Sequence, residues 1–266
     1  MSESLFVPDG DRFVPTPLCR GPWSPDAQHG GPPAALLARA VEHAAGPDDL
    51  AVARLTIELL RPVPLAPLTA AARIVRPGRK VQLVEATLDA GGTTVARAVA
   101  LRIRTRALPV PPGVPPAPPP FPLPAAGRDG RPPWGDGLAR PAFHSDAVDH
   151  RFVAGGFETP GPAIDWIRLR VPLVAGEPTS PLARVAAAAD FGNGISWVLS
   201  RLEGWLFINP DLTIHLHRHP AGEWVALEAV THVGGQGTGL AESRLWDERG
   251  PIGRSLQSLL LDRAAS

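Results

Sequence analysis

The sequence predicts an α+β protein built from two copies of one unit joined by a proline-rich segment. Three observations support this: a helix followed by four strand-like segments occurs twice, the two occurrences align without a gap, and proline dominates the stretch between them. A chain of 266 residues is long enough for two units of about 100 to 150 residues each. We therefore expect domains at residues 1–106 and 143–266, with a linker at 107–142.

The first half contains an extended segment, a helix and four strands. Residues 4–15 form the extended segment, and residues 33–45 place their apolar side chains on one helical stripe. The alternating or β-rich stretches that follow are 51–60, 68–76, 80–89 and 93–104. Glycine-containing turns at 76–78 and 90–92 separate the later strands.

The segment between the halves cannot build a core. Ten of the eighteen residues from 107 to 124 are proline, and the stretch has no apolar periodicity. Such a composition favours extended polyproline conformations and is typical of a semi-rigid connector. The polar, glycine-rich residues 127–137 continue it.

The second half repeats the order of the first. Its extended segment is 150–173, its helix is 179–189, and its strands are 211–218, 223–231, 238–246 and 251–262. A shift of 157 positions aligns seven identical residues: Ile57 with Ile214, Leu59 with Leu216, Arg61 with Arg218, Leu83 with Leu240, Glu85 with Glu242, Leu88 with Leu245 and Arg97 with Arg254. A strand, a long helix and a run of antiparallel strands describe a sheet wrapped around one helix. We therefore expect a tandem (double) hotdog fold, each long helix wrapped by an antiparallel sheet.

Composition and charge limit the classes of partner that we expect this chain to bind. The formal net charge is zero and 20% of the residues are charged, so no overall field favours nucleic acid or an anionic membrane. No apolar run approaches the roughly 20 residues of a membrane span, and the N-terminus has no signal-peptide pattern. We expect a cytoplasmic protein with a small-molecule partner. Cys19 is the single cysteine, which excludes an internal disulfide and a cysteine cluster for zinc.

Several motifs occur in a characteristic order over nearly the whole chain apart from the linker. They include His29-Gly30-Gly31, Leu60-Arg61-Pro62, Ala189-Asp190, Asn209-Pro210-Asp211, residues 214–218, Glu223-Trp224, residues 239–241 and residues 253–257. In these motifs the chain resembles the bacterial acyl-CoA thioesterase II family and its thioesterase-like relatives. The resemblance implies hydrolysis of acyl-CoA or a related acyl thioester without a cofactor.

The resemblance also implies a set of catalytic residues. In that family an Asp, a Thr or Ser, and a Gln from the second hotdog hold and activate the hydrolytic water. Here it places the Asp at Asp211 and the Gln at Gln257, while the hydroxyl position aligns with His232 and has Thr231 beside it. At the positions that the 157-residue shift makes equivalent, the first half lacks this set of polar residues. We therefore expect one site per chain.

Thioester hydrolysis needs a placed water, an acceptor for its proton and donors for the carbonyl oxygen. Asp211 can accept the proton, while Gln257 and Thr231 can orient the water. Because prolines follow the two glycines and carry no N–H, the amides of Gly30 and Gly31 are the expected oxyanion donors, with His29 adding a hydrogen bond.

Alternatives remain open at this point. Three histidines alternate at 215, 217 and 219, a spacing that resembles strand-borne metal ligands, but their alternation with apolar residues turns them away from the core, so we expect no metal site. The same alternation places Asp211 on the histidine face.

A catalytically silent acyl-CoA-binding protein is the second functional hypothesis. A hotdog hydratase or dehydratase ranks lower, because Phe207 and Leu212 stand where its Asp and His would. Acyl chain length, the CoA or acyl-carrier-protein carrier, and assembly into a homo-oligomer stay open.

Overall fold

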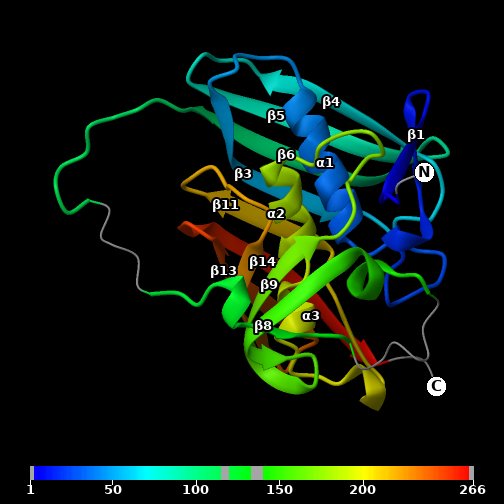
Figure 1. The fold of residues 1–266 in the computed structure, drawn as a ribbon. Coiled ribbons are helices and arrows are strands. Elements are labelled where there is room, and N and C mark those ends of the chain that lie inside the picture. The colour runs from blue at the N-terminus through cyan, green and yellow to red at the C-terminus, as the bar shows by residue number, and fades with distance from the viewer. Residues whose placement is uncertain (1–2, 115–119, 133–139, 264–266) are drawn as a thin grey trace.

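A computed structural model describes residues 3–114, 120–132 and 140–263 of the chain. The expected linker at 107–142 therefore lies partly outside the described residues, as does the glycine-rich stretch 127–137. Residues 105–114 leave the end of a strand and run away from the body of the protein (Figure 1). The boundaries of the linker stay a prediction.

The elements follow the predicted order closely. In the first half they are β1 (Phe6–Asp9), β2 (Arg12–Pro15), α1 (Gly31–His43), β3 (Leu50–Leu59), β4 (Leu68–Arg76), β5 (Val81–Ala90) and β6 (Thr93–Arg104). In the second they are β7 (Arg128–Asp129), β8 (Val148–Gly156), β9 (Thr159–Leu169), α2 (Pro181–Ala189), α3 (Gly192–Ile195), β10 (Trp205–Ile208), β11 (Asp211–Leu216), β12 (Val225–Val233), β13 (Thr238–Asp247) and β14 (Gly250–Arg263). The predicted helices and strands are present, and β7, α3 and β10 are additions.

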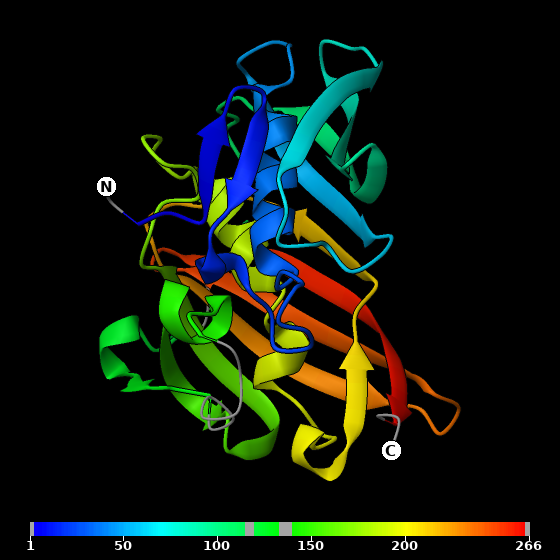
Figure 2. The ribbon, with the colours of Figure 1, turned by 90° about the vertical axis from the view of Figure 1, so that its right-hand side faces the viewer.

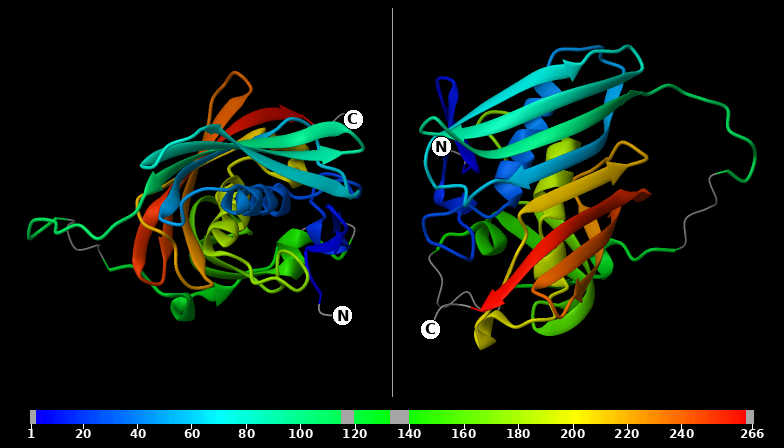
Figure 3. Two further views of the ribbon diagram at one scale, coloured as in Figure 1. Left: turned by 90° about the horizontal axis from the view of Figure 1, so that it is seen from above. Right: turned by 180° about the vertical axis from the view of Figure 1, so that it is seen from behind.

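Within the described residues the strands form one antiparallel sheet of fourteen. Its order is β1-β2-β4-β5-β6-β3-β11-β14-β13-β12-β9-β8-β7, with β10 paired to β14. The two halves meet where β3 pairs with β11, and Ile214 lies opposite Leu55 at this seam. One continuous sheet thus joins the two copies (Figure 3).

The duplication seen in the sequence is also present in the strand boundaries. A shift of 157 residues carries the bounds of β4 onto those of β12, and the bounds of β5 onto those of β13. It also carries a bulge of β3, between Val52 and Arg54, onto Asn209–Asp211, where the equivalent strand is broken into β10 and β11. Pro210 cannot donate to a strand ladder, which explains why the bulge becomes a break in the second half.

The helices α1 and α2 lie side by side on the concave side of the curved sheet, as Figure 3 shows from above. Their contact is close because α2 presents mostly alanine, and its residues 186–189 are all buried. The hydroxyl of Ser180 caps α2 by accepting the N–H of Ala183 at 3.1 Å, and it also donates to Glu42 of α1 at 2.5 Å. No helix in the described ranges is long and apolar enough to cross a membrane.

The β1–β2 hairpin lies beside α1 (Figure 2). Phe13 of β2 packs against the core, and the guanidinium of Arg39 on α1 lies 5.1 Å from its ring centroid. Arg39 also donates two hydrogen bonds, at 2.7 and 2.8 Å, to Glu177, which lies in the loop before α2. These contacts fix the C-terminal half of α1 between the hairpin and the second half.

The seam between the halves gives a stability prediction. Ile214 is fully buried on β11, whereas its neighbour His215 points to solvent from the other face. We expect Ile214→Ala to lower the free energy of unfolding by about 2–5 kcal/mol, because it removes buried methyl groups and leaves a cavity at the seam. His215→Ala should change it by less than about 0.5 kcal/mol. Urea unfolding monitored by tryptophan fluorescence measures both, and equal effects would contradict the assignment of the seam as core.

Candidate active site

A cavity of about 710 Å³ opens between the two halves. It lies among the loop before α1, the end of α2, the short helix α3, and β10. Much of its wall is aromatic: Trp23, Phe157, Phe191, Trp197 and Phe207. The volume and the lining are typical of a small-molecule site that holds an apolar group.

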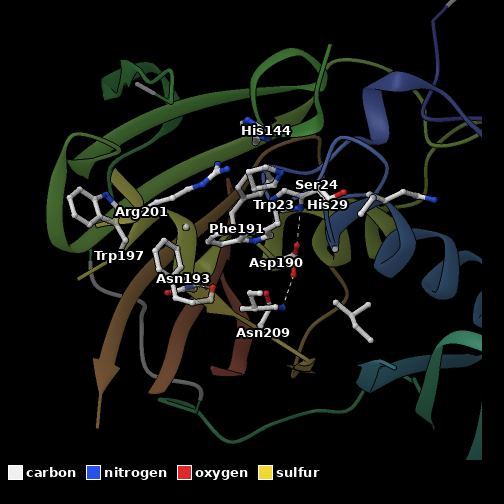
Figure 4. Close-up of a pocket in the computed structure, with 18 of the residues that line it drawn as sticks. Trp23, Ser24, His29, His144, Asp190, Phe191, Asn193, Trp197, Arg201 and Asn209 are labelled. Atoms are coloured by element: carbon white, nitrogen blue, oxygen red, sulfur yellow. Dashed lines mark hydrogen bonds and ion pairs between the residues drawn. The ribbon is translucent and has the colours of Figure 1, made fainter. Parts of the chain in front are cut away.

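One ion pair occupies the wall of this cavity. Nδ1 of His29, from the loop before α1, lies 2.8 Å from Oδ2 of Asp190, which ends α2. Their side chains are 11% and 5% exposed, so both are nearly removed from solvent. Figure 4 shows the two side chains pointing toward each other across the cavity wall. A residue of the first half and a residue of the second thus form a single pair.

Glycine at two positions makes this approach sterically feasible. A Cβ at Gly30 would lie 2.6 Å from Oδ2 of Asp190, closer than real Cβ contacts. A Cβ at Gly31 would lie 2.7 Å from the carbonyl oxygen of Ala187 on α2. The helix start and the helix end can meet only because neither position has a side chain.

Two amides complete the surroundings of the carboxylate. Asn209 donates from Nδ2 to Oδ1 of Asp190 at 2.9 Å, and it reaches there from the break between β10 and β11. Gln257 of β14 is 1% exposed and donates to the Asp190 backbone carbonyl at 3.2 Å and to Oδ1 at 3.4 Å. Its own oxygen accepts the N–H of Asn193 at 3.1 Å. The Gln257 amide is therefore oriented by hydrogen bonds at both ends, and Nδ2 of Asn209 is also held by the backbone carbonyl of Asp211 at 3.2 Å.

These contacts decide the charge of Asp190. Burial raises its pKa, but the proximity of His29 and the hydrogen bonds from His29, Asn209 and the Gly31 N–H outweigh burial and hold the pKa below its ordinary value. An ionised carboxylate requires a proton on the nitrogen that faces it, so Nδ1 of His29 is the donor. The Gly31 amide, 3.1 Å from that nitrogen, then donates to the carboxylate instead. In a neutral His29 ring, Nε2 is then the nitrogen that carries no proton.

Three of the residues predicted from the sequence are at this site. His29 and Gly30 line the cavity, and Gln257 contacts Asp190 from behind it. Gly31 turns its amide toward the ion pair, so it is not available as an oxyanion donor in this arrangement. Gly30 is the remaining backbone candidate at the helix start.

The other predicted residues lie outside the cavity lining. Asp211 is outside the cavity lining, and its Oδ1 accepts the backbone N–H of Ser258 at 2.7 Å. Thr231 is buried, bonded to Ser196 at 2.8 Å, and donates to Oδ1 of Asn193, a residue of the cavity lining, at 3.4 Å, whereas His232 is 58% exposed beside Glu242. Catalytic roles for Asp211, Thr231 and His232 stay predictions, and of the three only Thr231 contacts a residue of the cavity lining.

Asp190 and Asn209 were named by the sequence as motif residues but not as site residues. One signal was available: a carboxylate directly after a run of apolar helical residues at a helix C-terminus is unfavourable, because the helix dipole is negative there. The negative charge of such a residue must be stabilised by groups outside its own helix, and the start of α1 supplies them. Among the described residues, no group of histidine, cysteine and acidic side chains has the arrangement of a metal site.

A second histidine, His144, lines the cavity near the pair. It lies on a short turn, Phe143–Ala147, and its ring centroid is 6.4 Å from that of His29. Burial is the main reason that its pKa falls to about 3, and the proximity of His29, His150 and Arg201 adds to the effect. His144 is therefore neutral at physiological pH.

Comparison with known families places this geometry in context. The family model of the acyl-CoA thioesterase C-terminal domain matches residues 111–261, and that of the acyl-CoA thioesterase N-terminal domain matches residues 19–103. No curated protein matched the sequence of the chain. The two family matches thus cover both halves of the sheet except β1 and β2.

Solved structures share the fold over nearly the whole chain. A Thermobifida fusca protein provisionally named thioesterase II is 22% identical, with 98% of this chain and 96% of that chain covered and a TM-score of 0.72. A hot dog protein of unknown function from Alicyclobacillus acidocaldarius is 18% identical, covering 97% and 95%, with a TM-score of 0.70. An acyl-CoA thioesterase II from Mycobacterium marinum is 17% identical, covering 100% and 97%, with a TM-score of 0.66. The expected hotdog fold is confirmed at this level.

The low pKa of His144 predicts a loss of stability in acid. Below about pH 6.5 the unfolded chain binds a proton that folded His144 rejects, so the stability that this residue contributes is present above that pH and is lost as the pH falls toward about 3. Between pH 7 and pH 5 the wild type should lose about 2 kcal/mol more unfolding free energy than His144→Gln. Urea unfolding at both pH values measures this difference. Parallel losses in the two proteins would show that His144 takes up its proton in the folded state.

Proposed function

The chain belongs to the acyl-CoA thioesterase family, and from that premise we propose that it hydrolyses acyl-CoA or a related acyl thioester without a cofactor. The observation that carries the proposal is the buried His29–Asp190 pair on the wall of an apolar cavity of about 710 Å³. The aromatic wall suits an acyl chain, and the polar pair lies where its thioester carbonyl can be placed.

In this proposal His29 is the general base. Asp190 is a weak base because its pKa is low, whereas a neutral imidazole is well suited to accept a proton near neutral pH. Asp190 holds the ring with Nδ1–H toward itself, so Nε2 accepts the proton of a water in the cavity. The carboxylate then stabilises the imidazolium that forms.

The remaining groups have supporting roles. The oxygen of the water attacks the thioester carbon as its proton passes to His29. The negative charge that develops on the carbonyl oxygen needs a nearby hydrogen-bond donor. The Gly30 amide at the start of α1 is the proposed donor, with no side chain to hold the thioester at a distance. Asn209 and Gln257 fix the Asp190 carboxylate. The thiolate of CoA leaves and takes the proton from His29.

The proposal includes a tandem hotdog organisation in which the two domains divide the labour. The first half supplies His29 and Gly30, and the second half supplies Asp190, Asn209 and Gln257. This is one shared site per chain, as expected from the sequence, although the base comes from the first half. The support for it is the ion pair that joins the halves.

Two carboxylates can be compared in one experiment. We expect Asp190→Asn to lower kcat for acyl-CoA by about 10²–10⁴-fold, because the amide no longer holds the donor on Nδ1 of His29. Asp211→Asn is the matched control, since an amide oxygen can still accept the Ser258 N–H, and it should leave kcat unchanged. Free-thiol release over a panel of acyl chain lengths measures both variants.

The outcomes separate the alternatives. If Asp211→Asn lost activity and Asp190→Asn kept it, the catalytic carboxylate would be Asp211, as the family resemblance implies. Tight acyl-CoA binding by the wild type with no thiol release at any chain length would instead identify a catalytically silent binding protein.

A further inference from the structure

The cavity wall carries a positive charge that the proposed reaction does not use. Arg201 begins a short turn, Arg201–Glu203, and its side chain extends along the cavity wall toward Trp23 and His144 (Figure 4). Its guanidinium lies 5.2 Å from the ring centroid of Trp23. Nη1 of this guanidinium is buried and has no hydrogen-bond partner in the described part of the chain.

No carboxylate offsets this charge. Among the described residues, none of the acidic side chains forms an ion pair with Arg201, whereas other partly buried arginines do, such as Arg39 with Glu177 and Arg218 with Asp247. Burial alone lowers the pKa of Arg201, and no acidic neighbour opposes it. An unpaired cation that is partly removed from water is costly, and an anionic group of a ligand in the cavity would complete the pair.

His144 adds a second unpaired polar atom to the same part of the wall. It is 4% exposed, and its Nδ1 is buried without a partner among the described residues. Its neutral ring still has one N–H to donate, and the charge of Arg201 acts on it directly. Two donors, a guanidinium and an imidazole, therefore line one side of an otherwise aromatic cavity.

We propose that this side of the cavity binds an anionic oxygen group of the substrate, a carboxylate or a phosphate, through Arg201 beside Trp23 and His144. The planar fork of a guanidinium matches both groups with two parallel hydrogen bonds. The carboxylate source would be a terminal acid on the acyl chain, and the phosphate source would be CoA itself. This inference deepens the proposed function, since it concerns the substrate class of that site.

The test measures binding, so it does not depend on turnover. Four non-hydrolysable thioethers are the probes: S-alkyl and S-(ω-carboxyalkyl) derivatives of CoA, and the same two derivatives of pantetheine, which lacks the nucleotide phosphates. Calorimetric titration gives Kd for the wild type, Arg201→Met and Arg201→Lys over several chain lengths. Arg168→Met is the matched control, because Arg168 also lies over a tryptophan, Trp224, at 4.7 Å, but outside the cavity lining.

The expected result is a selective loss of affinity. Arg201→Met should weaken the anion-bearing ligand by about 10- to 100-fold, Arg201→Lys by less, and Arg168→Met not at all. A loss confined to both ω-carboxyalkyl ligands identifies an acyl carboxylate, and a loss confined to both CoA ligands identifies a phosphate. If Arg201→Met does not fold, the Arg201→Lys comparison decides by the same pattern.

Other results would overturn the inference. They are equal changes for all four ligands, no change for any, or no binding of any ligand by the wild type. Thiol release by wild-type protein is measured separately on acyl-CoA. Its absence would count against the proposed hydrolysis while leaving the anion site supported by the thioether titrations.

Discussion

The ion pair between His29 and Asp190 is the interaction on which the site depends. It joins the start of α1 to the end of α2, and hence the first half of the chain to the second. Its burial requires glycine at positions 30 and 31 and a helix α2 made mostly of alanine, because larger side chains would separate the two helix ends. A carboxylate at the C-terminus of its own helix is unfavourable, and here the start of the facing helix compensates it.

The sheet explains why such a pair forms once. Duplication gives both halves the same strands and the same irregularity in the strand next to the seam. In the second half Pro210 turns that irregularity into a break, and the break directs Asn209 toward Asp190. The first half keeps Val52 at the equivalent position and has no amide to offer. The two halves therefore share their strands, but Asn209 and Pro210 give the second half a contact with Asp190 that the first half cannot make.

Most of the fold could be predicted from periodicity and the repeat, since the predicted helices and long strands lie within a few residues of the observed ones. The short strand β10 was missed because four apolar residues carry no period. The site was predicted less well. Alternation correctly placed Asp211 on the outer face, but motif order favoured it over Asp190, whose role depends on the packing of two helix ends that no local pattern describes. Gln257 was found through the resemblance of residues 253–257 to the family motif, and the structure shows that this amide is buried beside Asp190.

The ionisation of Asp190 tests the central claim most directly. The carboxyl carbon of Asp190 can be followed by NMR as a function of pH in the wild type and in His29→Ala. The account predicts a midpoint below the ordinary aspartate value of about 3.9 in the wild type, and a rise above that value in the variant, because burial then acts without the opposing imidazole. The same midpoint in both proteins would show that His29 does not hold the charge of Asp190, and the proposed base would lose its support.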